Sequence, residues 1–162
     1  MIRPKVIALL SVLILLPMIL TCSRTAEQEL PENGFGYLDQ TLSAGVNQIQ
    51  FFLTTTEAVK GVEFFLAWDP QQARVDLPKL LSGHDKFVIH ARKHDAASMK
   101  VLIFSMESLV FDSSKPWLFE LPLEPIPSTG EIKLDIQKTI FAGSNSAQFN
   151  IPTLTGTLKI GS

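Results

Sequence analysis

The residues of this sequence with the clearest capacity for chemistry are three histidines, His84, His90 and His94. His90 and His94 are four residues apart, and residues at even spacing share one face of a β-strand, so their imidazoles could bind one metal ion. Arg92 and Lys93 lie between them and oppose a cation, and no neighbouring cysteine or pair of carboxylates completes the coordination sphere. We therefore expect surface histidines near a hairpin and no metal site.

Motifs for other catalytic chemistry are missing as well. The sequence has no Gly-x-Ser-x-Gly elbow, no phosphate-binding loop and no His-Glu-x-x-His motif. Asp112, Glu120 and Asp135 are typical of solvated carboxylates unless folding brings two of them into one cleft. Trp68 and Trp117 could stack on sugars, but the alternation of their segments turns both inward. We expect neither an enzyme nor a cofactor.

Length and charge limit the organisation and the partners. A chain of 162 residues, with 46% hydrophobic and 19% charged residues, can bury one core but is too short for two ordinary domains. The formal net charge is −2, and no run of lysine or arginine could follow a phosphate backbone. We therefore do not expect nucleic acid to be a partner.

The N-terminal residues predict export. Arg3 and Lys5 precede an almost wholly apolar stretch, 6–20, that ends just before the only cysteine, Cys22. About 15 apolar residues are fewer than the roughly 18–20 of a membrane span, and Pro17 interrupts them. Residues 1–21 are therefore predicted to be a signal peptide.

The residues Ile19-Leu20-Thr21-Cys22 resemble the lipobox of bacterial lipoproteins. That resemblance implies cleavage before Cys22 and acylation of its thiol, which would attach the protein to a membrane of the cell envelope. The alternative is ordinary signal-peptidase cleavage nearby, for example after Ser23, which would leave a secreted or periplasmic protein. Residues 22–36 are polar and lack an apolar period, and they read as a flexible tether to a domain at 37–162.

The domain is predicted to consist of short strands. The segment 61–68 alternates most clearly, with Val62, Phe64, Leu66 and Trp68 on one face, and Asp69-Pro70 ends it. The segment 95–98 is predicted to be a hairpin link. Apolar residues alternate in the same way in four further segments: Ile49, Phe51 and Leu53; Phe87, Ile89 and Ala91; Trp117, Phe119 and Leu121; and Ile132, Leu134 and Ile136. No amphipathic helix is visible. The expected fold is all-β, an antiparallel two-sheet jelly-roll sandwich of about eight or nine strands.

The order of the strand-end motifs resembles that of cohesin domains. The series runs from about residue 46 to residue 161 and comprises Trp68-Asp69-Pro70, Leu80-Leu81-Ser82-Gly83, Met99-Lys100-Val101-Leu102-Ile103, Trp117-Leu118-Phe119, Phe141-Ala142 and Gly156-Thr157-Leu158. Pro122 departs from the pattern, because a proline in a central strand lacks the N–H of a ladder bond. The resemblance implies a non-catalytic recognition module with a dockerin-like protein partner.

The resemblance also implies a binding surface on the outer face of the sheet that contains 61–68. By alternation this face carries Glu63, Phe65 and Ala67, with Lys100 and Leu102 as neighbours. An exposed Phe65 beside a charged Glu63 suits a protein interface. Two alternatives stay open: a polysaccharide-binding module, for which Phe65 and Tyr37 are the candidate sugar-stacking residues, and a structural subunit of a surface assembly.

Overall fold

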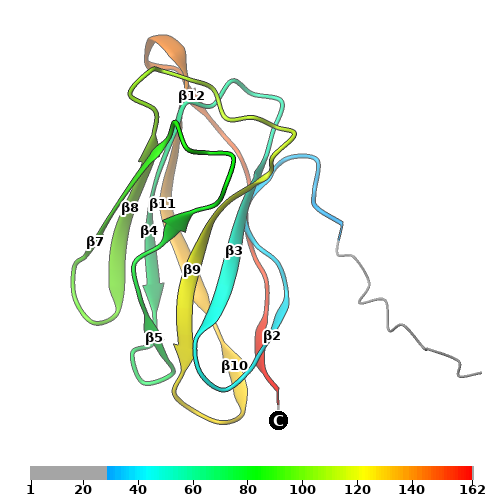
Figure 1. Ribbon diagram of the computed structural model, residues 1–162, viewed down its shortest axis with the longest axis vertical. Coiled ribbons are helices and arrows are strands. Elements are labelled where there is room, and N and C mark those ends of the chain that lie inside the picture. The colour runs from blue at the N-terminus through cyan, green and yellow to red at the C-terminus, as the bar shows by residue number, and fades with distance from the viewer. Residues whose placement is uncertain (1–28, 162) are drawn as a thin grey trace, which may run out of the picture.

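The computed structural model describes residues 29–161, and its strands form two layers that face each other across one core (Figure 1). One layer, the β4 sheet, has the order β12-β11-β4-β8-β7, and every neighbouring pair in it is antiparallel. Its strands are Gln148–Phe149 (β12), Leu134–Ala142 (β11), Gly61–Trp68 (β4), Ser98–Phe104 (β8) and Val88–Lys93 (β7).

The other layer, the β3 sheet, has the order β13-β1-β3-β9-β5, and β6 also pairs with β9. Its strands are Thr153–Thr155 (β13), Gly34–Tyr37 (β1), Asn47–Thr54 (β3), Trp117–Pro125 (β9), Ala73–Val75 (β5) and Lys79–Leu80 (β6). A three-stranded sheet of order β10-β14-β2 comprises Gly130–Ile132, Leu158–Ile160 and Gln40–Leu42, and one 3-10 turn spans Ser144–Ser146. Within residues 29–161, no helix is long and apolar enough to cross a membrane. The predicted all-β sandwich is confirmed.

Two strand pairs are parallel and join the beginning of the described chain to its end. β1 pairs with β13 and β2 pairs with β14. A glycine is needed for the first pairing, because a Cβ at Gly36, where φ is +151°, would lie 1.7 Å from the carbonyl oxygen of Leu154. β1 begins at Gly34, so residues 34–36 belong to a strand and not to the predicted tether. Four residues with two glycines are too few to show an apolar period.

Alternation along β4 places its inward side chains as predicted. Phe64 and Leu66 are fully buried and Trp68 is nearly so. Aromatic rings fill the space between the sheets: Phe51 of β3 stacks on Phe119 of β9 with centroids 4.5 Å apart, and Phe64 lies 5.9 Å from the same ring. Stacked and edge-on aromatic pairs add to the stabilisation from buried area.

Tyr37 joins β1 to the first residue of β11. Its hydroxyl donates to the carbonyl oxygen of Leu134 at 2.9 Å and accepts from the amide nitrogen of Leu134 at 3.2 Å. Burial raises the pKa of the Tyr37 phenol, and the negative charge of Asp135 adds to that effect, while the bond to Leu134 lowers it. The same burial removes Tyr37 from the candidate sugar-stacking residues.

Trp117 is not directed inward as predicted. It lies half-buried on the outer side of the β3 sheet, edge-on to Phe52 at 6.0 Å. The register shifts between the Phe51–Phe119 and Phe52–Trp117 pairs, so Leu118 is an extra residue of β9 and is buried together with Phe119. Such a β-bulge reverses the side on which the preceding residue lies.

Pro122 lies within β9 and does not end it, because the strand continues to Pro125. Its carbonyl oxygen accepts from the amide of Asp76, which follows β5. The N and C=O of one residue point to the same side of a strand, so the missing N–H of Pro122 faces the segment that follows β5, and the ladder between β9 and β3 loses no bond.

Candidate functional site

The outer face of the β4 sheet presents side chains in rows that cross the strands. In one row, Arg92 of β7, Lys100 of β8, Phe65 of β4 and Gln137 of β11 are register partners. The next row contains His90, Leu102, Glu63 and Ile140. Ala67 lies in the row on the other side of Phe65, beside Ser98 and Asp135. The structure thus brings all five predicted partner-binding residues, Glu63, Phe65, Ala67, Lys100 and Leu102, onto one face.

Phe65 is at the centre of this face and is half-buried, although alternation predicts an exposed ring. The imidazole of His94 stacks on it with centroids 5.7 Å apart and planes at 18°. The ammonium groups of Lys100 and Lys138 lie 5.7 Å and 5.2 Å from its centroid. These distances are typical of cation–π contacts. The ring therefore has three polar, solvent-accessible side chains against it.

Glu63 and Lys100 form an ion pair across β4 and β8. The Lys100 Nζ is 2.7 Å from the Glu63 Oε1, and the two side chains are 41% and 31% exposed. A pair this open to water contributes about 0–1 kcal/mol to stability. Its main effect is to neutralise both charges and to hold the Lys100 stem against the rows.

Lys138 reaches Phe65 because of a bulge in β11. The register of β11 on β4 shifts between Gln137 and Ile140, and Lys138 has φ +50°. A regular pleat would turn residue 138 away from the side of Gln137, toward the core. The bulge instead leaves Lys138 exposed. Sequence reasoning missed this residue, because no glycine or proline in 134–142 signals the irregularity.

The β7–β8 hairpin positions His94. Asp95 closes the turn, since its Oδ1 accepts from the amide of Ala97 at 2.8 Å and from the Ser98 hydroxyl at 3.0 Å. These hydrogen bonds hold the pKa of Asp95 below its usual range, with the Ala97 amide as the largest cause. The predicted hairpin link is confirmed, and it brings His94 over Phe65.

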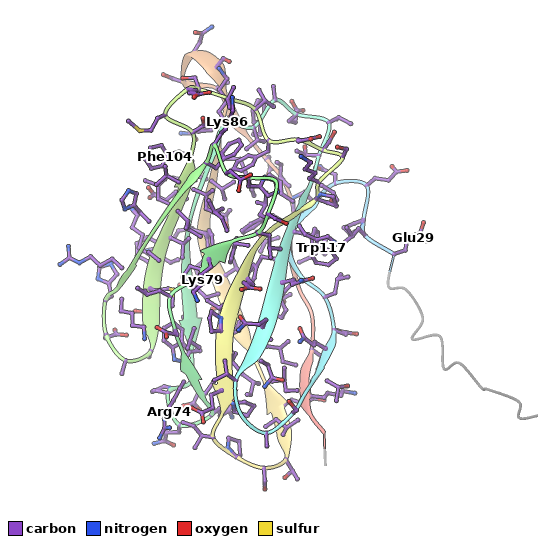
Figure 2. All side chains as sticks on the ribbon, viewed as in Figure 1. Glu29, Arg74, Lys79, Lys86, Phe104 and Trp117 are labelled. Atoms are coloured by element: carbon purple, nitrogen blue, oxygen red, sulfur yellow. The ribbon has the colours of Figure 1, made fainter. Side chains whose placement is uncertain are left out.

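An open groove runs along the face between β4 and β7. It is lined by Glu63, Phe65, His90, Ala91, Arg92, His94, Lys100 and Leu102. Four of the five predicted residues are among them; Ala67 is not. Figure 2 shows side chains over this side of the sheet, where the labelled Phe104 of β8 lies. An apolar floor with charged walls is a shape that suits a protein segment.

The other two histidines have separate surroundings. His90 stacks on Phe104 at 5.9 Å, whereas His84 is 1% exposed, and its Nε2 lies 3.0 Å from the Trp117 carbonyl oxygen. The prediction of a surface position is wrong for His84, because the loops at that end fold over it with Phe87 and Phe111. In the described part of the chain, no group of three His, Cys, Asp or Glu residues could hold a metal ion.

A platform for sugars would need a row of exposed aromatic rings. The large exposed apolar residues among 29–161 are all aliphatic: Val46, Leu77, Met106, Val110, Ile126, Ile140 and Leu154. Of the two candidate stacking residues, Tyr37 is buried, and Phe65 is a single half-buried ring that does not form a row of exposed rings. The geometry thus favours a protein ligand over a polysaccharide.

Comparison with known proteins agrees with this architecture. No family model and no curated protein matches the sequence. Among solved structures, the sixth cohesin of scaffoldin B from Acetivibrio cellulolyticus, in complex with a dockerin, has a TM-score of 0.68 at 11% identity and covers 81% of this chain and 100% of its own. The domain has a cohesin-like fold.

Two further cohesins support the same fold. A non-cellulosomal cohesin from the archaeon Archaeoglobus fulgidus has a TM-score of 0.66 at 14% identity, over 82% of this chain and 93% of its own. The cohesin module of a family 33 glycoside hydrolase from Clostridium perfringens has a TM-score of 0.62 at 12% identity, over 78% and 93%. The cohesin-like fold is therefore shared with modules from very different source proteins.

Proposed function

We propose that this domain is a non-catalytic recognition module that binds a dockerin-like protein partner through the outer face of the β4 sheet. The observation that carries the proposal is Phe65, a large apolar ring in an open groove with an imidazole and two ammonium groups against it. Similarity to cohesins solved with dockerins supports the choice of partner class.

The physical basis is the behaviour of interface anchors. Binding energy concentrates in a few aromatic or arginine residues that become fully desolvated, with charged residues around them. Phe65 has a floor of Leu102 beside it and Arg92 and Glu63 at the groove walls. A partner that displaces water from this ring would gain apolar burial and charge complementarity together.

The test is recovery of partners from extracts of the source organism by the wild-type domain and by Phe65→Ala and Glu63→Lys variants. Phe65→Ala should weaken binding of the recovered partner by about 1–3 kcal/mol, while the fold stays intact. Gln50→Ala, an exposed change on the β3 sheet, is the matched control. Equal recovery by all four proteins would rule out this face, and retention on insoluble polysaccharide without a protein partner would favour the carbohydrate alternative.

We also propose that the domain is carried on an exported lipoprotein of the cell envelope, with Cys22 as the acylated residue. Cys22 lies outside the described residues, and the proposal is supported by its position directly after the apolar stretch 6–20. Mass spectrometry of the mature N-terminus should find two acyl chains on Cys22. An unmodified terminus downstream of residue 22 would contradict the lipid anchor.

A further inference from the structure

We infer that the outer face of the β4 sheet recognises an acidic protein segment, with Arg92 and Lys138 binding its carboxylates on the two sides of Phe65. This inference rests on the proposed function and specifies the partner's chemistry. It is carried by two independent features of the described residues: the charges left without a partner, and a strained residue in a strand.

The first feature is the balance of charges. Five ion pairs are found within residues 29–161, and none of them contains Arg92 or Lys138. Of the two carboxylates of the face, Glu63 pairs with Lys100, whereas Asp135 accepts from the neutral Gln137 amide and keeps its charge one row away, beside Ala67. Two cations therefore remain for a ligand.

These two cations lie at opposite ends of one row. Arg92 is on β7, and Lys138 follows Gln137, the β11 member of the same row, with Lys100 and Phe65 between them. Three strand intervals of about 4.8 Å separate β7 from β11, so the row is about 14 Å long. An extended segment needs about five residues to cross it, which places two carboxylates around one apolar side chain over Phe65.

The second feature is the backbone of Lys138. Among residues 29–161, four non-glycine residues have positive φ, and three of them, Ser108, Asn145 and Ser146, lie in turns. Lys138 is the one that lies within a strand of the described chain. A left-handed conformation is unfavourable for a lysine, and such residues persist where the surrounding structure or a function requires them. Here the conformation has one visible result, an ammonium group placed over Phe65.

The chemistry of the two groups fits carboxylates. A guanidinium can bind a carboxylate through two parallel hydrogen bonds, and a lysine ammonium donates in three directions, so contact with the Phe65 face leaves donors free. Both side chains are exposed and outside the ion pairs of residues 29–161, so they can pair with a ligand without first breaking a salt bridge. The ligand would then order the aliphatic parts of the Arg92 and Lys138 side chains.

The experiment titrates the domain with three extended peptides of about ten residues that repeat the pattern X-Ser-Leu-Ser and differ only in X, which is Glu, Gln or Lys, so that X and leucine lie on the same face. Chemical-shift changes at Phe65 report binding. The Glu peptide should bind, the Gln peptide roughly tenfold more weakly, and the Lys peptide not at all. Added salt should weaken the binding of the Glu peptide.

Charge-reversal variants complete the test. Lys138→Glu and Arg92→Glu should each weaken binding of the Glu peptide roughly tenfold, and Lys138→Arg should restore it. Lys79→Glu on β6 of the other sheet is the matched control and should change nothing. Equal binding of the Glu and Gln peptides, no binding of the Glu peptide, full binding by Lys138→Glu, or equal shifts with inorganic phosphate would each overturn the inference.

Failure of this inference can be distinguished from failure of the proposed function. If Phe65→Ala abolishes recovery of a natural partner but both charge reversals leave it unchanged, the face binds proteins and the partner is not acidic. If Phe65→Ala has no effect on recovery either, the proposed function fails as well.

Discussion

The two outer faces of the sandwich each contain one phenylalanine from the middle of a strand, and the two rings have opposite surroundings. Phe52 on the β3 sheet is completely buried and lies edge-on to Trp117. Phe65 on the β4 sheet is half-buried beneath a histidine and two ammonium groups. An apolar cover makes a ring part of the fold, whereas a polar cover can be displaced by a ligand.

The two outer faces also differ in how far their charges are paired within the domain. On the β3 sheet, Arg74 of β5 pairs with Glu124 of β9 at 3.4 Å. On the β4 sheet, the structure leaves Arg92 and Lys138 outside the ion pairs of residues 29–161. One face is thus internally balanced, and the other has a positive excess around an accessible ring.

The largest expected effect separates the two rings by stability. Phe52→Ala should lower the free energy of unfolding by about 3–5 kcal/mol, because a fully buried ring leaves a cavity. Phe65→Ala should lower it by about 1 kcal/mol or less, because the ring is partly hydrated already. Urea denaturation of both variants measures the difference. Equal losses of unfolding free energy in the two variants would contradict the difference between the two rings.

The next effect tests the link between the two sheets. Tyr37→Phe should cost about 1–3 kcal/mol, because it leaves both backbone groups of Leu134 without the hydroxyl. Burial raises the pKa of the folded phenol, so the unfolded phenol loses its proton first, near pH 10. This contribution to stability is complete below pH 10 and is lost as the pH rises through the folded pKa.

Tyr37 is the only tyrosine of the chain, so phenolate absorbance follows its ionisation directly. Wild-type protein should lose more stability above pH 10 than Tyr37→Phe, since the lysines titrate alike in both proteins. Ionisation of the folded protein at the ordinary tyrosine pKa would disprove the raised value.

The smallest effect concerns the bulge of β11. Lys138→Gly should be more stable than Lys138→Ala by about 1 kcal/mol, because only glycine adopts a positive φ without strain. Gln137 is the matched control: there, alanine should exceed glycine by about 0.5–1 kcal/mol, as in an ordinary strand. Thermal unfolding of the four variants gives both differences. If alanine were more stable than glycine at both positions, residue 138 would be unstrained.

Local alternation was sufficient to predict β4 and the face that contains Glu63 and Phe65. It could not predict the bulges at Leu118 and Lys138, because a bulge is fixed by the pairing of two strands that are distant in the sequence. His84 was placed wrongly for a similar reason, since loops distant in the sequence cover it. The row that joins Arg92 to the neighbour of Lys138, and the strained backbone of Lys138, therefore became visible only in the structure.

The parallel pairings β1–β13 and β2–β14 have a consequence for the order of folding. In the described chain, β2 has its partner strand, and β1 one of its two, more than a hundred residues away, so the β3 sheet is complete only when residue 155 has been synthesised and the three-stranded sheet only when residue 160 has been. Long-range pairing of this kind slows folding, because the loop must close before the contacts form. A nascent chain with this topology therefore makes its last two strand pairings only after residues 153–160 have been synthesised.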